Sequence, residues 1–486
     1  MRSLGTDTRS KSPVALSSEG RRQGTYILGI NGTGKSNLIL DIALQDIAAG
    51  DGLCLMDPHG DLIEAVLERV PPERVDDVIL FDPSDIDFPF GLNMFECSDT
   101  SNPRVVDRVC SEVVLTFKKL FVDFWGPRME DLIRHAVLTL MATPECTMLD
   151  MLPMLTDAAA RERYVSRTQD PVLRHYWEQA FPDNKRTQGE WVSSTLNKIG
   201  RFLTNPVIRN IVAQPKSSFD IREVMDSGKV LLVNLSKGKL GEDNAALLGS
   251  VLVGKILIAA LSRAELRFED RRPFHLIVDE YHSFATESFP TLQAEVRKFA
   301  IDTIVAHQYR DQLDPLNRGS TLSVGNFIIF RITGQDAHEI AMQFDNTPPE
   351  GEPKLATIPY RTGRDGVYRT AGDKVLAASS RRGYGDVQNE TANYLTNTPN
   401  YRAYCKFIEG DALTEHCVAT RRVDTAADRT TAERITNNSR RLARPRAEVE
   451  ARVVRLWSSE VSESDAYVEG SGRKPMARPV TNGRTR

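Results

Sequence analysis

The feature that most constrains this chain is a glycine-rich octapeptide, residues 29–36, which reads GINGTGKS. It follows the short apolar run Tyr26-Ile27-Leu28, so it lies where a buried strand is expected to turn into a helix. The pattern GxxxxGK[ST] is typical of a phosphate-binding loop, in which glycines let backbone N–H groups close around phosphates without Cβ clashes. The octapeptide therefore predicts a nucleotide-binding protein rather than a turn that only caps a helix.

The positions of this loop have distinct expected roles. Lys35 is expected to reach the β- and γ-phosphates, and the Ser36 hydroxyl is expected to ligate Mg²⁺. The predicted cofactors are therefore ATP and Mg²⁺. The predicted nucleotide-binding residues are Gly29, Asn31, Gly32, Thr33, Gly34, Lys35, Ser36 and Asn37.

Apolar runs that alternate with helical patterns predict an α/β fold. Several runs are nearly continuous, as strands buried on both faces of a parallel sheet should be. The expected strands are residues 25–28, 53–56, 78–81, 230–234, 274–278, 303–306 and 327–332. Expected helices between them are residues 36–49, 62–69, 244–263 and 289–299. Ligands bind such mostly parallel sheets at the carboxyl ends of the strands, which is where the phosphate loop lies.

The strand signal disappears between residues 97 and 221, and helical periodicity replaces it. Clear helical patterns cover residues 102–121, 128–141 and 191–203. We therefore expect an all-α domain inserted into the nucleotide-binding domain. The predicted order is a polar lead-in (1–24), the first part of the nucleotide-binding domain (25–96), the helical insertion (97–221), the second part (222–420) and a basic, poorly ordered tail (421–486).

The charge of the chain is unevenly distributed. Residues 421–486 hold 15 Lys/Arg against 9 Asp/Glu, a net +6, so the formal −4 of the whole chain leaves −10 for residues 1–420. Such a tail is typical either of a disordered, solvated segment or of one that contacts nucleic acid or acidic partners. Just before it, residues 401–408 form a last apolar segment that could add an edge strand.

Other compositional features restrict the class of protein. The six cysteines form no CxxC pair, which favours reduced thiols in a cytosolic protein over structural zinc. The N-terminus lacks the apolar core of a signal peptide. The longest apolar stretch, residues 245–261, is short for a membrane span and is expected to form a buried core helix, so no intrinsic membrane span is predicted.

A second motif, residues 276–280, is an apolar strand that ends in two acids and reads LIVDE. Two acids at the end of a buried strand are costly unless their charge is used. Asp279 is expected to hold the Mg²⁺ ion, and Glu280 to polarise the attacking water as a general base. The alternative is a helix N-cap with a first-turn acid, but the upstream phosphate loop favours the catalytic interpretation. The motif lies about 240 residues after Lys35, a distance that the helical insertion explains.

Four further residues are candidates for the same site, and each has a structural alternative. Gln308 follows the strand expected beside the phosphate-loop strand and could contact the γ-phosphate or orient water; a surface loop Gln is the alternative. Arg297 is a candidate arginine finger for a neighbouring subunit, and Arg331 a buried cation that a phosphate could pair; either could be a plain ion-pair residue. Asp57 could order the cleft or only form an Asp-Pro turn. The predicted catalytic residues are Glu280, Lys35, Gln308 and Arg297.

Several segments together resemble the conjugative type IV secretion coupling ATPases, the TraG-like members of the FtsK-HerA superfamily. The resemblance spans about residues 25–334 and rests on the segments GINGTGKS, LMDPHGDL, FDPSDIDFPFGLNMFE, FWGPRMEDLIRHA, LNKIGRFLTNP, VLLVNLSKGKLG, HLIVDE and IVAHQ. A weaker likeness continues through NTPNYRAYCKF.

The resemblance implies a RecA-like P-loop motor that assembles as a homo-hexamer and moves DNA through its central channel by ATP hydrolysis. It implies that the inserted domain meets relaxosome or secretion-channel proteins. By the same resemblance Lys35 and Ser36 bind phosphate and Mg²⁺, Asp279 and Glu280 serve hydrolysis, Gln308 senses the γ-phosphate, and Arg297 is the finger. DNA contact would be independent of base sequence, through Lys/Arg such as those of residues 364–382.

One departure from this family leaves the cellular setting open. Coupling proteins usually carry N-terminal transmembrane helices, whereas about 24 polar residues precede the first expected strand here. The expected localisation is cytoplasmic, with attachment at the inner face of the plasma membrane through partners as one possibility. A truncated reading frame is another interpretation. Two alternative functions stay open: a HerA-like DNA translocase in repair or defence, and a nucleotide-switched module that docks proteins.

Overall fold

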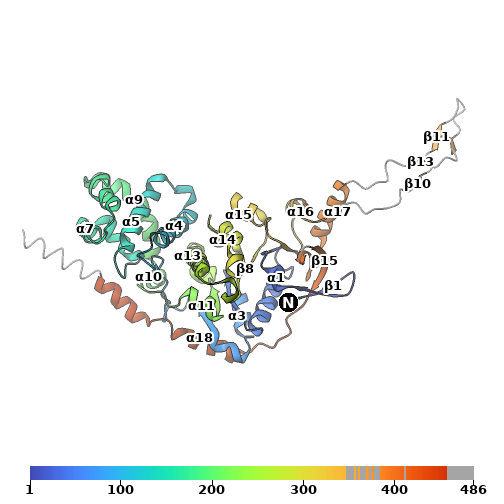
Figure 1. Cartoon of the computed structure of the whole chain (residues 1–486), viewed down its shortest axis with the longest axis horizontal. Coiled ribbons are helices and arrows are strands. Elements are labelled where there is room, and N and C mark those ends of the chain that lie inside the picture. The colour runs from blue at the N-terminus through green and yellow to red at the C-terminus, as the bar shows by residue number, and fades with distance from the viewer. Residues whose placement is uncertain are drawn as a thin grey trace, which may run out of the picture. The chain divides into compact units, whose positions relative to one another are not determined.

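The computed structural model describes residues 1–345, 355–356, 359–361, 368–370, 375–376, 384–409 and 412–456. These residues form two compact units, shown in Figure 1. The first unit contains Met1–Asp82, Leu115–Leu120 and Phe219–Ser439. The second contains Pro83–Val114, Phe121–Ser218 and the described residues from Arg440 onward. Most of the stretch 364–382, where the sequence suggested DNA-contacting cations, lies outside the described residues.

The first unit is built on an 11-stranded sheet with the order β2-β1-β15-β14-β9-β3-β8-β7-β4-β6-β5. Neighbouring strands from β9 to β5 pair in parallel, so the predicted α/β fold with a mostly parallel sheet is confirmed. These strands are β9 (Asn326–Ile329), β3 (Thr25–Leu28), β8 (Ile301–His307), β7 (Phe274–Val278), β4 (Gly52–Asp57), β6 (Val230–Asn234) and β5 (Val78–Phe81). All of their residues are buried, which explains the continuous apolar runs in the sequence.

Antiparallel strands extend the sheet beyond β9, and two expectations are corrected here. The segment expected at 401–408 forms β14 (Arg402–Glu409), which lies between β9 and β15 (Ala412–Thr420) and is therefore not an edge strand. The predicted polar lead-in forms a hairpin of β1 (Arg2–Asp7) and β2 (Pro13–Leu16), followed by the short helix α1 (Ser18–Arg21). Alternating apolar side chains explain the hairpin, since Leu4, Val14 and Leu16 are buried while their neighbours are more exposed.

One face of the sheet carries a large hydrophobic core. It is covered by α2 (Lys35–Ala48) and α3 (Asp61–Leu67), whose apolar side chains pack onto alternate strand residues such as Ile27, Leu55 and Leu232. The sheet unit also contains α11 (Ile221–Ser227), α13 (Glu242–Ser262) and α14 (Phe289–Glu295). The helix expected at 289–299 changes after α14 to a 3₁₀ turn, Val296–Phe299.

α13 is the long apolar helix that the sequence predicts as a core helix. The stretch Glu242–Glu265 has a mean hydropathy of 2.1 over its most apolar window, and 72% of that window is buried inside the protein. Among the described residues it is the one helix that is long and apolar enough to cross a membrane.

The region after residue 420 is better packed than the sequence suggested. It contains α18 (Arg429–Arg440), whose Ile435 is fully buried in the core of the sheet unit. A further helix over residues 446–456 buries Val449 and Val453. The expectation of a poorly packed tail is therefore corrected for residues 429–456, because a few apolar side chains at helical spacing anchor an otherwise polar segment.

The second unit is helical in its described residues and covers most of the segment predicted as an insertion, although it begins earlier, at Pro83. Its helices are α4 (Pro103–Leu120, which ends in the sheet unit), α5 (Pro127–Met141), α6 (Met151–Thr156), α7 (Ala158–Arg167), α8 (Pro171–His175), a π-helical turn (Tyr176–Ala180), α9 (Lys185–Leu203) and α10 (Pro206–Val212). Side-chain caps mark where several begin: Asp157, Asp170, Asn184 and Asn205 each accept from backbone N–H groups of the first turn.

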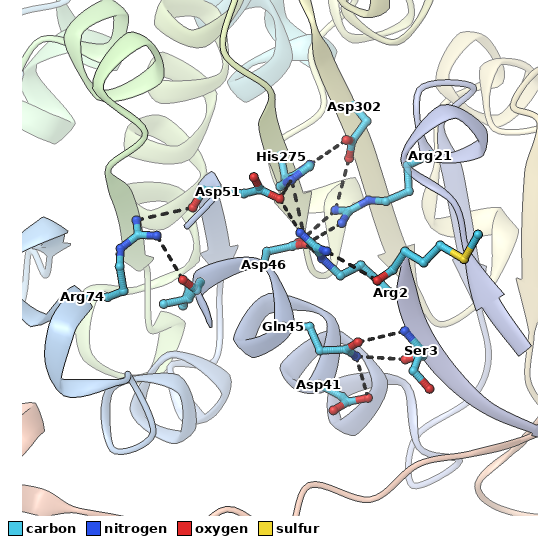
Figure 2. A network of polar contacts seen from close by, with 12 residues as sticks. Arg2, Ser3, Arg21, Asp41, Gln45, Asp46, Asp51, Arg74, His275 and Asp302 are labelled. Carbon is cyan, nitrogen blue, oxygen red and sulfur yellow. Dashed lines mark hydrogen bonds and ion pairs between the residues drawn. The ribbon is translucent and has the colours of Figure 1, made fainter. Parts of the chain in front are cut away.

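An ionic network lies at the amino ends of β7 and β8 and just before β4 (Figure 2). The phosphate loop follows the carboxyl end of β3, so it lies at the opposite edge of the parallel strands. Asp46, near the end of α2, pairs with Arg2 (2.5 Å) and Arg21 (2.6 Å). His275, at the start of β7, lies 2.6 Å from Asp302 through Nδ1 and 3.4 Å from Asp51 through Nε2. The carboxylates of Asp302 and Asp46 outweigh burial and raise the pKa of His275 to about 9.

The ligand atoms of Asp46, Asp51 and His275 lie within 4.8 Å of one another, a spacing that could also suit a metal ion. We interpret the group as an ion-pair network instead. Both ring nitrogens of His275 face carboxylates, and Asp46 is already paired with two guanidinium groups. The network ties the N-terminal strand to α2 and to two central strands.

Candidate active site

The phosphate loop connects β3 to α2 and has the backbone geometry that its glycines predict. Gly32 and Gly34 have φ of +75° and +115°, in the left-handed region that L side chains avoid. A Cβ on Gly34 would lie 3.0 Å from the ring of Tyr401, and one on Gly29 would lie 2.6 Å from the Cβ of Phe330. Backbone conformation therefore favours glycine at position 32, close packing favours it at position 29, and both favour it at position 34.

Lys35 lies inside the loop. Its Nζ donates to the Gly29 carbonyl (2.6 Å), and the side chain is buried. Burial lowers the pKa of Lys35, and the negative charges of Glu280 and Asp279 act in the opposite direction. The ammonium group is thus within electrostatic range of both acids, so the two predicted motifs face each other across the site.

Sheet topology explains how the motifs meet. β3, β8 and β7 are neighbours that run parallel, with Leu28 beside His307 and Val278 beside Val305. The phosphate loop, Gln308 and the acid pair follow the carboxyl ends of these three strands. Parallel strands end at the same edge of a sheet, so three segments far apart in the sequence converge there.

Asp279 and Glu280 are both buried, at 4% and 5% exposure. Burial, together with the charges of Glu280 and Asp57, raises the pKa of Asp279 to about 7. Two buried acids beside a single lysine form a site that favours a bound cation. The residues present therefore fit the predicted Mg²⁺, which Asp279 and the exposed hydroxyl of Ser36 would hold, and the phosphates fit the loop N–H groups and Lys35.

The carboxylate of Glu280 is held by residues from two segments. Gln308 donates from Nε2 to Oε1 of Glu280 (2.8 Å). The other oxygen, Oε2, lies 3.4 Å from Nδ1 of His282 and accepts no hydrogen bond from the described residues. Burial and nearby lysines lower the pKa of His282 to about 4, so this imidazole is neutral near pH 7. A buried carboxylate oxygen with spare acceptor capacity suits a group that orients and deprotonates a water molecule.

The end of α4 contacts the segment that follows Glu280. Lys119 donates from Nζ to the carbonyl of His282 (3.0 Å), and Lys118 pairs with Glu287 (2.9 Å). Burial lowers the pKa of Lys119 to about 8. The last turn of α4 therefore positions the loop that carries the acid pair.

Two predicted site residues make other contacts. Arg297 is hydrogen-bonded to Gln23 (2.7 Å) in an exposed position, so it does not reach the phosphate loop of its own chain. The Asn37 side chain donates to the carbonyl of Arg421 (2.7 Å), which lies in the segment that follows β15.

Arg331 corrects an expectation. β9 ends at Ile329, so Arg331 lies beyond the strand, half-buried, and donates to Asn400 (2.8 Å) rather than interrupting a buried strand. Asp57 forms the expected turn, because it accepts from the N–H groups of His59, Gly60 and Leu62. Its charge also raises the pKa of Asp279, so Asp57 contributes to the site as well.

Sequence reasoning missed two neighbours of the site. His282 had a weak signal, since it follows Glu280 by two residues in DEYHSF. Tyr401, whose ring contacts Gly34, lies in the segment NTPNYRAYCKF of the weaker likeness, but no local pattern placed it at the phosphate loop, because its position depends on how β14 packs.

Comparison with known proteins adds independent evidence. No model of a protein family matches the sequence. A curated relative, the type 4 coupling protein DotL of Legionella pneumophila, is 22% identical over 382 residues, which cover 66% of this chain. The match covers 48% of DotL, so the chain spans about half the length of the curated relative that it matches.

Solved structures of the bacterial conjugative coupling protein TrwB share the fold. The unbound form has a TM-score of 0.53 at 15% identity and covers 88% of this chain and 91% of its own. The form in complex with a non-hydrolysable ATP analogue has a TM-score of 0.53 at 17% identity, covering 87% and 95%. The form with ADP and Mg²⁺ has a TM-score of 0.51 at 16% identity, covering 87% and 90%. The RecA-like P-loop fold and the resemblance to type IV coupling proteins are therefore confirmed.

Proposed function

We propose that this chain binds ATP with Mg²⁺ and hydrolyses it to ADP and phosphate. The observation that carries the proposal is the convergence of Lys35, Glu280 and Gln308 at the carboxyl ends of three adjacent strands. That TrwB was solved with an ATP analogue and with ADP and Mg²⁺ supports the same assignment.

Each residue has a defined part in the reaction. Loop N–H groups and Lys35 hold the phosphates, and Mg²⁺ held by Ser36 and Asp279 would supply charge neutralisation. Glu280 accepts a proton from the attacking water through its unshared oxygen, Oε2. Gln308 holds the other oxygen in place and can respond to loss of the γ-phosphate.

We further propose that hydrolysis drives a coupling protein that moves DNA towards a type IV secretion channel. The match to DotL and the fold shared with TrwB support this role. In this proposal the chain works as a homo-hexamer on the cytoplasmic side of the plasma membrane, where relaxosome or channel proteins hold it. Contact with DNA is independent of base sequence, because it relies on Lys and Arg side chains that pair with phosphates.

ATPase measurements on the full chain test these proposals in order. Wild type should hydrolyse ATP, and Lys35→Ala and Glu280→Gln should each lose about 100-fold or more in rate. Glu280→Gln should still bind ATP, since the phosphate grip is intact. Glu269→Gln is the matched control, because it neutralises an exposed acid outside the site and should leave hydrolysis close to wild type.

The DNA step has its own readout. Turnover should rise with DNA length at fixed salt, and the stimulation should fall steeply as salt increases. Normal hydrolysis that ignores DNA of every type would reject translocation and favour a nucleotide-switched docking module. Undiminished hydrolysis in Glu280→Gln would reject the assigned active site.

A further inference from the structure

Tyr401, in the loop between α17 (Tyr384–Asn397) and β14, packs against the phosphate loop. Its backbone N–H donates to the carbonyl of Thr33 (2.7 Å). Its ring lies against Gly34, where an added Cβ would be 3.0 Å from ring atom Cδ1. The aromatic ring is therefore fixed at the point where the loop turns into α2.

The backbone of Tyr401 is held in an unfavourable conformation. Its φ is +60°, a region that suits Gly or Asn and that a bulky side chain rarely adopts. Both the N–H and the hydroxyl of Thr420 donate to the Tyr401 carbonyl (2.9 and 3.1 Å), which locks this conformation. Backbone strain of this kind concentrates at ligand-binding sites, which indicates that the Tyr401 ring has a function at this position.

Arg422 stacks on that ring. Its guanidinium carbon is 4.2 Å from the ring centroid, and the side chain is exposed. The segment that carries it is pinned to the first turns of α2, because Asn37 donates to the Arg421 carbonyl (2.7 Å) and the Arg421 guanidinium pairs with Asp41 (3.1 Å). A planar cation backed by an aromatic ring thus lies beside the start of the phosphate-binding helix.

We propose that Arg422 and Tyr401 form the platform on which the base of the bound nucleoside triphosphate stacks. The inference rests on the proposed nucleotide binding by the phosphate loop. Phosphates held at the start of α2 leave the ribose and base to extend from the α-phosphate along the adjacent surface, where Arg422 presents its guanidinium plane. A guanidinium stacks on the π-face that every base has and does not read base edges, so adenine and guanine nucleotides bind with similar affinity.

Dissociation constants for ATP, GTP and inorganic tripolyphosphate, measured by calorimetry on the full chain with Mg²⁺, test this platform. Arg422→Ala removes the guanidinium. Tyr401→Asn removes the ring but suits the positive φ, so the backbone of the loop is kept. Arg429→Ala is the matched control, because Arg429 is a highly exposed arginine on the nearby helix α18.

Both platform variants should weaken ATP and GTP about 10-fold, which is the size expected for the loss of one stacking contact, and leave tripolyphosphate unchanged. Arg429→Ala should leave the dissociation constants for ATP, GTP and tripolyphosphate unchanged. An equal loss for ATP and tripolyphosphate would show that Arg422 acts on phosphate charge and would overturn the platform, as would unchanged ATP binding in both variants. Failure of the wild type to bind tripolyphosphate would instead reject the phosphate loop as a nucleotide site, and with it the proposed stacking platform.

Discussion

Glu280 combines an unfavourable backbone with a well-fixed side chain. Its φ and ψ of 43° and 49° are left-handed, an uncommon conformation for a residue with a side chain. Its N–H donates to Asp279 (3.0 Å), its carbonyl accepts from Ser283 (2.9 Å), and its carboxylate accepts from Gln308 (2.8 Å). Contacts on each side therefore maintain the geometry that the proposed hydrolysis needs.

Removal of the Gln308 side chain should slow catalysis while ATP binding stays nearly unchanged. We expect Gln308→Ala to lower kcat about 10- to 100-fold, because the Glu280 carboxylate loses the donor that orients it. KM for ATP should stay within about threefold, since Gln308 is not part of the phosphate grip. Steady-state ATPase assays check this, with Gln335→Ala, an exposed glutamine that donates to Asp311, as the control. A loss confined to KM would contradict the positioning role.

His275 makes stability depend on pH. Its pKa is raised from 6.5 to about 9 by Asp302 and Asp46, so the folded state binds the proton more tightly than the unfolded chain. The stabilisation is complete below pH 6.5 and is lost as pH rises through 9. Its size is on the order of 3 kcal/mol.

Urea unfolding between pH 6.5 and 9.5 measures this effect. Wild type should lose stability more steeply across this range than His275→Gln, whose side chain does not titrate. His338→Gln, at an exposed histidine, should keep the slope of wild type. Equal slopes in wild type and His275→Gln would show that the network does not hold the proton.

At the scale of elements, helix α18 illustrates how a polar sequence gains a fixed position. Of its described side chains, Ile435 is fully buried in the sheet core, and the Ser439 hydroxyl oxygen accepts from the backbone N–H of Leu80 (2.9 Å). A single large apolar residue can anchor such a helix, because the burial of one isoleucine is worth about 2 kcal/mol. The helix therefore belongs to the domain and not to a solvated tail.

Truncation of the Ile435 side chain should destabilise the protein. Ile435→Ala is expected to lower the free energy of unfolding by about 3 kcal/mol, through lost burial and the cavity left in the core. Urea unfolding followed by circular dichroism measures it. Glu433→Ala, on the exposed side of the same helix, should change stability by less than about 0.5 kcal/mol. Similar effects for the two variants would mean that α18 is not docked in solution.

At the scale of the whole molecule, the position of Arg297 bears on assembly. It is exposed and bonded to Gln23, away from the phosphate loop of its own chain. An arginine finger supplied to a neighbouring subunit would occupy such a position. The proposed ring would thus have active sites that are complete only between subunits.

Mixing variants tests this directly. Arg297→Ala alone should bind ATP normally but hydrolyse it at least 100-fold more slowly. Mixed with inactive Glu280→Gln, it should regain activity, because some interfaces then pair an intact Glu280 with an intact Arg297 from the neighbouring chain. Lys298→Ala, which removes an exposed cation paired with Glu295, serves as the control. No recovery on mixing, or normal turnover in Arg297→Ala, would exclude a finger supplied in trans.

Much of this protein could be predicted from local sequence patterns. Continuous apolar runs located the parallel strands, since burial on both faces leaves a local signal. GINGTGKS and the acids after residue 278 predicted a nucleotide site, because phosphate and metal chemistry restrict which residues can serve at fixed spacing. Gln308 was predicted for the same reason, as the polar residue that follows the neighbouring strand.

Contacts between residues distant in sequence left no such pattern. The pairing of the N-terminal hairpin with β15, the docking of Tyr401 on Gly34, and the bonds that join Arg2, Asp46 and His275 all depend on how separate segments pack. Local residue patterns record which side chains face a core, but not which partner meets them there. The residues proposed to act on the phosphates could thus be predicted from the sequence, whereas the neighbours of the site and the ionic network arose only once the chain had packed.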